Sequence, residues 1–111
     1  MGDVKKLAVL VSGNGSNLQS IVDSINIGEI NANISLVISN IETAFALTRA
    51  KKENLNSAFL NHKNFSSRES FDKALSELLI KHEVDLIVLA GFMRILSNSF
   101  VEKFNRKIIN I

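Results

Sequence analysis

The sequence predicts an α/β fold, a Rossmann-like parallel sheet with flanking helices. Short apolar runs rich in Val, Ile and Leu alternate with stretches whose apolar residues recur at spacings of three and four. This alternation is typical of strand–helix–strand units and a parallel sheet. Hydrophobic residues make up 46% and charged residues 22% of the 111 positions, as in an ordinary globular protein. We therefore expect one folded domain over residues 1–111.

Five apolar runs are expected to form the strands. The first, residues 6–11, is rich in Val and Leu and ends at Ser12 and Gly13. Such a continuous run is typical of a strand that is buried on both faces. The other expected strands are residues 34–39, 58–60, 84–90 and 107–111.

The first two helices are expected between these strands. Residues 17–27 place Leu18, Ile21 and Val22 on one apolar stripe. Gly28 stands where a helix C-terminus often has a glycine. Residues 43–53 form the second expected helix, and its core-facing residues are predicted to be Phe45, Leu47 and Ala50.

Two serines predict the starts of the other helices. Ser67 is expected to be an N-cap, without a strict capping box because Ser70 rather than Glu or Gln stands three residues on. Ser97 is expected to cap a short helix that runs to about Phe104. The helix after Ser67 has the strongest periodicity of the sequence, in Phe71, Ala74, Leu75, Leu78 and Leu79.

The composition excludes several classes of function. The absence of cysteine excludes disulfides, cysteine metal sites and a cysteine nucleophile, and we expect no metal site. A net charge of +2 is too small to predict nucleic-acid binding. The apolar runs are too short to span a membrane, and no signal peptide is recognisable at the N-terminus. We therefore expect a cytoplasmic protein that binds neither nucleic acid nor membranes.

In parallel sheets of this kind, ligands bind beyond the carboxyl ends of the strands. The loops that follow the expected strands are residues 12–17, 39–43, 61–68 and 91–97.

The loop at residues 12–17 suits a phosphate. Its glycines allow a sharp turn, and the amides of Gly15, Ser16 and Asn17 are expected at the open N-terminus of a helix. Leu18 replaces the third glycine of the dinucleotide fingerprint, and the P-loop lysine is also missing. The loop therefore fits one phosphate better than a pyrophosphate, unless it is only a tight turn.

The loop at residues 91–97 is unusually apolar. It could form the wall of a site for a flat ligand, or Phe92, Ile95 and Leu96 could simply pack under the next helix. Arg68 is unusual because a cation at a helix start opposes the macrodipole, which suggests an anionic ligand. His62 and His82 are expected to be structural or surface residues.

Together these loops resemble those of the glycinamide ribonucleotide formyltransferases. The most specific segments are SGNGSNLQ and LAGFMRIL, and the likeness runs from about residue 6 to residue 111. The resemblance implies the formyltransferase fold and a transferase of purine biosynthesis. Its reaction would transfer a formyl group from 10-formyltetrahydrofolate, the co-substrate, to the amine of glycinamide ribonucleotide.

The resemblance also implies roles for individual residues. The substrate phosphate would be held by Gly15, Ser16 and Asn17, and Arg68 would meet the glutamate carboxylate of the folate. Asn110 would contact the folate and be catalytic, orienting the formyl carbonyl and stabilising the oxyanion. The remaining folate-binding residues would be Met93, Arg94, Ile95 and Leu96, largely through backbone groups.

In this family a catalytic His and a later Asp follow the Asn-Ile pair, here Asn110 and Ile111. We therefore expect residues 1–111 to be the N-terminal phosphate- and folate-binding part of the domain, cut before the catalytic His and inactive alone. We also expect a homo-oligomer through the exposed strand at residues 107–111. The alternatives are a formyltetrahydrofolate hydrolase, a non-catalytic phosphate-binding module or, less in keeping with the charge, a tRNA-directed formyltransferase.

Overall fold

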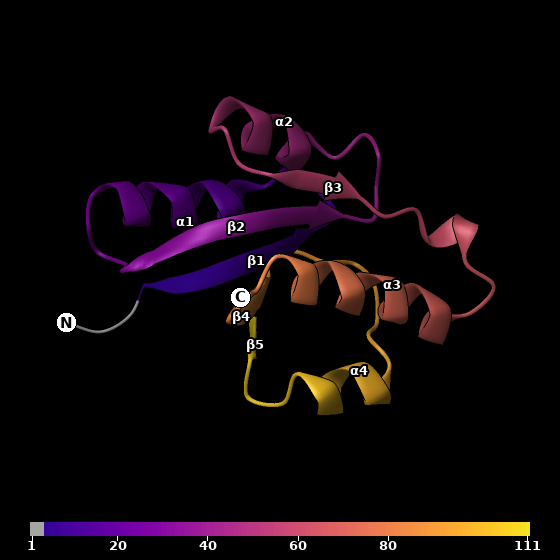
Figure 1. The fold of residues 1–111 in the computed structure, drawn as a ribbon. Coiled ribbons are helices and arrows are strands. Elements are labelled where there is room, and N and C mark those ends of the chain that lie inside the picture. The colour runs from indigo at the N-terminus through magenta and orange to yellow at the C-terminus, as the bar shows by residue number, and fades with distance from the viewer. Residues whose placement is uncertain (1–3) are drawn as a thin grey trace.

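The computed structural model describes residues 4–111 and contains one five-stranded sheet (Figure 1). All four pairs of neighbouring strands are parallel, and their order is β3-β2-β1-β4-β5. The predicted α/β fold with a parallel sheet is therefore confirmed. The strands are β1 (Lys5–Val11), β2 (Ala32–Ser39), β3 (Ser57–Phe59), β4 (Leu86–Leu89) and β5 (Ile108–Asn110).

Two helices cover each face of the sheet (Figure 1). Because the chain runs outward from β1 to β3 and then returns to β4, the strand order reverses between β1 and β4. Such a switch point is where α/β sheets leave a crevice for ligands. One face carries α1 (Ser16–Asn26) and α2 (Phe45–Lys52), and the other carries α3 (Arg68–Lys81) and α4 (Asn98–Lys103).

Alternation along β1 divides the core into two layers. Leu7, Val9 and Val11 pack toward α1 and α2, whereas Ala8 and Leu10 pack toward α3 and α4. All five are buried because the strand is covered on both faces. The continuous apolar run predicted this double burial.

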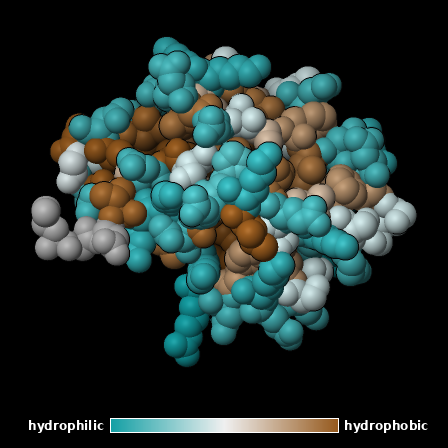
Figure 2. Space-filling model, viewed as in Figure 1, coloured by the Kyte–Doolittle hydropathy of each residue, from teal (hydrophilic) through white to brown (hydrophobic). Residues whose placement is uncertain are grey.

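Figure 2 shows hydrophilic side chains on the surface, with hydrophobic patches between them.

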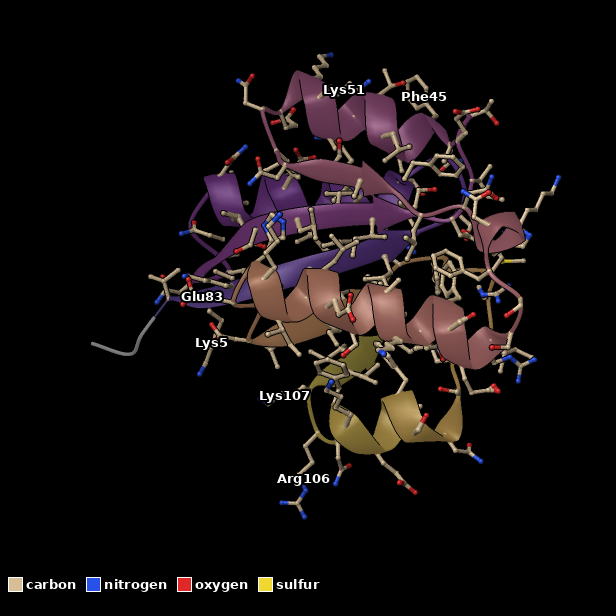
Figure 3. All side chains as sticks on the ribbon, turned by 45° about the vertical axis from the view of Figure 1, so that its right-hand side comes forward. Lys5, Phe45, Lys51, Glu83, Arg106 and Lys107 are labelled. Carbon is tan, nitrogen blue, oxygen red and sulfur yellow. The ribbon has the colours of Figure 1, made fainter. Side chains whose placement is uncertain are left out.

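The predicted inner face of the second helix is confirmed for Ala50, which is buried, but wrong for Phe45 and Leu47. Phe45 is 54% exposed, and Leu47 is only half-buried. The buried residues of α2 are Ala46 and Ala50, because the helix lies so close to the sheet and the loop after β1 that only small side chains fit. Phe45 lies on the outside of α2 (Figure 3), where its ring is 5.0 Å from the Arg49 guanidinium carbon.

The predicted helix ends are largely confirmed. Gly28 has φ +82°, and the Ser67 and Ser97 side chains both accept a backbone N–H of their helix. A capping box does form at Ser67, contrary to the expectation, because the short Ser70 side chain reaches the backbone N–H of Ser67. Within residues 4–111, no helix is long and apolar enough to cross a membrane.

Candidate functional site

The carboxyl ends of the strands meet at the edge to which the β2 and β3 arrows point in Figure 1. The loops from β1 and β4 lie at the centre of this edge, because these strands are neighbours. Leu89 of β4 pairs with Asn110 of β5, so Asn110 ends its strand beside the start of the β4 loop. The edge thus brings together three segments that the sequence predicted to be functional.

The loop after β1 lines one side of a hollow of about 180 Å³. Gly15 is the N-cap of α1, with φ +80° and ψ 24°. The Ser16 N–H is not open as predicted, because it donates to Asn14 Oδ1 at 2.9 Å. Within the described residues, the N–H groups of Gly15 and Asn17 meet no acceptor. The lining residues are Gly13, Asn14, Gly15, Ser16, Asn17, Ala90 and Gly91.

Helix α2 holds this loop in place. Arg49 Nε donates to the Asn14 carbonyl at 2.7 Å, and the Ala46 N–H donates to the Gly13 carbonyl at 3.1 Å. A Cβ added to Gly15 would lie 2.7 Å from Ala46 Cβ and 2.8 Å from Ala46 Cα. The glycine is therefore required by the approach of α2 as well as by its own positive φ.

The loop Gly91–Ser97 turns alternate side chains inward and outward. Phe92 and Leu96 pack into the core beneath α3 and α4, which matches the structural alternative for this loop. Ile95, expected to pack with them, is instead 71% exposed, and Met93 is 82% exposed. Both remain available to a ligand. The Arg94 guanidinium carbon lies over the Phe71 ring, 4.3 Å from its centre.

A second hollow, of about 380 Å³, lies between this loop and the start of α3. Arg68 is exposed at the first position of α3 and shares this hollow with Ile95 and Leu96, whereas Met93 and Arg94 lie outside its lining. The full lining is Arg68, Glu69, Ile95, Leu96, Ser97, Asn98 and Ser99.

Neither histidine lines the two hollows. His62 lies in a 3₁₀ turn, His62–Asn64, and His82 is the C-cap residue of α3. Within residues 4–111, no group of three His, Cys, Asp or Glu side chains is arranged to hold a metal ion.

Sequence reasoning missed the residues that join the loops. Ser12 Oγ donates to Asn40 Oδ1 at 2.5 Å and accepts the Met93 N–H at 2.8 Å. One hydroxyl thus joins the segments that follow β1, β2 and β4. The available signal was that Ser12 and Asn40 each directly follow an apolar strand, but their pairing depends on strand order.

Comparisons with known proteins agree with this geometry. A family model described as formyl transferase matches residues 5–111. The phosphoribosylglycinamide formyltransferase of Haemophilus influenzae is 47% identical over 108 residues, which cover 97% of this chain and 51% of that protein. The trifunctional purine biosynthetic protein adenosine-3 of Homo sapiens is 42% identical over 106 residues, which cover 96% of this chain and 10% of that protein.

Solved structures give the same result. Glycinamide ribonucleotide transformylase 1 of Symbiobacterium toebii matches with a TM-score of 0.94 and 35% identity, over 99% of this chain and 52% of that one. The phosphoribosylglycinamide formyltransferase of Campylobacter jejuni matches with a TM-score of 0.89 and 44% identity, over 99% of this chain and 58% of that one. This chain spans about half the length of these bacterial relatives. From its loops, its sheet and these likenesses, the chain belongs to the formyl transferase family.

Proposed function

We propose that this chain carries the phosphate- and folate-binding part of a glycinamide ribonucleotide formyltransferase. The reaction transfers a formyl group from 10-formyltetrahydrofolate to the amine of glycinamide ribonucleotide in purine biosynthesis, in the cytoplasm. The observation that carries the proposal is the pair of hollows at one sheet edge, one lined by Gly13–Asn17 and the other by Arg68 and Leu96. The loop after β4 contributes to both.

The first hollow suits the substrate phosphate. The N–H groups of Gly15 and Asn17 have no acceptor among residues 4–111, and they lie at the N-terminus of the 11-residue helix α1. Unpaired amides and the helix dipole attract an anion to this place. The Ser16 and Asn17 side chains can add hydrogen bonds, and Ser16 contributes its N–H once Asn14 Oδ1 releases it.

The second hollow suits the folate. The Arg68 guanidinium can bind the glutamate carboxylate through two parallel hydrogen bonds. On the far side of the hollow lie Ile95 and Leu96, which offer apolar contact, and the backbone of residues 93–96 can pair with the polar edge of the pterin. Arg94 stays against Phe71, so its contribution is to fix this backbone.

Asn110 stands beside the start of the β4 loop. In the proposed reaction, this is where the formyl carbon meets the amine. The Asn110 carboxamide N–H can donate to the formyl oxygen and become a stronger donor as negative charge develops there. Removing one such donor typically lowers the rate about 10²–10³-fold.

Parallel titrations of the 111-residue chain test the proposal. Calorimetry should detect binding of glycinamide ribonucleotide and binding of a stable 10-formyl folate analogue. Inorganic phosphate should compete with glycinamide ribonucleotide. Arg68→Ala should lower the affinity for the glutamate-bearing analogue about tenfold or more. The affinity for a pteroate that lacks glutamate should be unchanged. Lys73→Ala, which removes an exposed cation of the same helix, is the matched control. Binding of the folate without glycinamide ribonucleotide would favour a hydrolase and contradict the proposal.

We propose further that β5 mediates self-association. Within the described residues its outer edge has no neighbouring strand, and Ile109 and Ile111 are exposed, although Ile108 packs against the α3–α4 layer. Sedimentation velocity at micromolar concentration should show a dimer or larger species that Ile109→Lys reduces to monomer; a monomeric parent chain would contradict this. An apolar groove of about 280 Å³ adjoins this edge, lined by Lys5, Leu7, Ile21, Ile30, Asn31, Ala32, Leu86, Val88, Ile109 and Ile111.

A further inference from the structure

The loop Gly91–Ser97 is anchored at two points by buried side chains that do not line the proposed folate hollow. Near its start, Ser12 Oγ accepts the Met93 N–H at 2.8 Å. At its end, Asp72 Oδ2 accepts the Ser97 N–H at 2.6 Å. These two bonds span 81 and 25 positions of the sequence, so they join the loop to elements that are distant along the chain.

The buried position of the Asp72 side chain is energetically unfavourable for a carboxylate. Its side chain is in the α3–α4 layer and only 3% exposed, and its Oδ1 has no partner within residues 4–111. Burying a carboxylate is unfavourable unless its hydrogen bonds compensate, so packing alone does not account for this residue. The bond to Ser97 is what Asp72 adds, and Ser97 in turn accepts the Phe100 N–H and starts α4.

Through its helix and its bond to Ser97, Asp72 links the two sides of the proposed folate hollow, α3 and the loop Gly91–Ser97. Arg68 precedes Asp72 by four residues on α3, so the two lie on the same helix face, about 6 Å apart along the axis. Holding Ser97 against Asp72 therefore keeps Ile95 and Leu96 opposite Arg68. The stacking of Arg94 on Phe71 is a further contact between the loop and α3, because Phe71 adjoins Asp72 on that helix.

Ser12 connects the loop to the other hollow. It directly precedes Gly13 of the phosphate loop, and it is buried with Asn40, whose Oδ1 accepts a hydrogen bond from the Ser12 hydroxyl. Losing the hydroxyl would leave the Met93 N–H and the Asn40 carboxamide without this partner. Both the start of the β4 loop and the path of the phosphate loop would then be less well defined.

We propose that Ser12 and Asp72 are positioning residues: Asp72 acts on the folate site alone, and Ser12 acts on both the folate and the phosphate sites. The proposal rests on the proposed function, since it assigns these residues to that site. The two residues differ in a measurable way, because only Ser12 adjoins the phosphate loop.

The test measures folate-analogue and inorganic phosphate affinities for each variant, together with hydrogen exchange at the Met93 and Ser97 amides. Asp72→Ala should lower the affinity for the folate analogue about tenfold and keep the affinity for phosphate within about twofold. It should also speed hydrogen exchange at the Ser97 amide. Asp72→Asn keeps an oxygen that can accept the Ser97 N–H, and it should restore folate affinity to within about threefold. Ser12→Ala should weaken both ligands, each about three- to tenfold, and speed exchange at Met93.

Two matched controls separate positioning from general damage. Ser76→Ala removes a buried hydroxyl one turn along α3 that has no partner in the described part of the chain. Ser20→Ala removes a hydroxyl that donates to the Ser16 carbonyl within α1. Both should leave the two affinities unchanged. If the parent chain binds the folate analogue and Asp72→Ala binds it equally well, or if Asp72→Asn fails to rescue it, the positioning role is overturned while the proposed function stands. If the parent chain binds phosphate but no folate, both proposals fall.

Discussion

The two central loops of the sheet edge are held through opposite backbone groups, the carbonyls of Gly13–Asn17 and the N–H groups of Gly91–Ser97. The loop Gly13–Asn17 is held mainly through its backbone, by a left-handed glycine and by bonds from Arg49 and Ala46 of α2. The loop Gly91–Ser97 is held through distant buried side chains, while Met93 and Ile95 project outward. A backbone-built site suits a small, fixed anion. A loop anchored near its two ends can present both backbone and side chains to a larger ligand.

The largest effect is expected at Gly15 of the loop Gly13–Asn17, and Gly13 of the same loop serves as the comparison. Gly15→Ala should lower the free energy of unfolding by roughly 2–4 kcal/mol and abolish phosphate binding, because the new Cβ meets Ala46 and φ is +80°. Gly13→Ala is the control, since a Cβ there meets no atom of the described residues within 4 Å. Urea denaturation and phosphate titration measure both variants. Equal effects of the two substitutions would show that α2 does not constrain this loop.

Removing the α2 contact should have the next largest effect. Arg49→Ala loses the 2.7 Å bond to the Asn14 carbonyl, which should cost about 1–2 kcal/mol of stability and weaken phosphate binding about tenfold. The affinity for the folate analogue should be unchanged, because Arg49 contacts Asn14, Gln19 and Phe45, and none of these residues lines the folate hollow. Lys52→Ala, an exposed cation of the same helix, is the control in both titrations. A comparable loss of folate affinity would show that the two loops are not independent here.

The cap of α3 supports the folate side. Ser67→Ala should lower stability by about 1 kcal/mol, since the Ser70 N–H loses its acceptor. Ser70→Ala keeps that bond and loses the bonds of the Ser70 hydroxyl to the Ser67 N–H and to the Ser67 carbonyl. Because that carbonyl still accepts the Phe71 N–H, we expect about half the effect. Thermal denaturation ranks the two. A larger effect of Ser70→Ala would mean that the reciprocal bond is the stronger half of the box.

The smallest expected effect is at the most exposed side chain of the second loop. Met93→Ala should change stability by less than about 0.5 kcal/mol, because the side chain is 82% exposed. If the backbone makes the ligand contacts, folate affinity should stay within about twofold. Calorimetry checks this, and a loss of tenfold or more would assign the contact to the Met93 side chain itself.

Local sequence signals predicted much of this molecule. The five strands followed from continuous apolar runs, and the helix starts at Ser67 and Ser97 followed from capping chemistry. The positive φ of Gly15 and Gly28 suits the glycines found there. These features depend on neighbouring residues, so the sequence by itself determined them.

Tertiary structure decided the rest. Phe45 is exposed because α2 approaches so closely that only Ala46 and Ala50 fit beneath it, and helical spacing carries no information on that approach. The bonds of Ser12 to Met93 and of Asp72 to Ser97 depend on which strands become neighbours and which helix lies under the loop. A polar residue after a strand predicts a site in general terms. Its partner is known only when the packing of distant elements brings the two side chains within hydrogen-bonding distance.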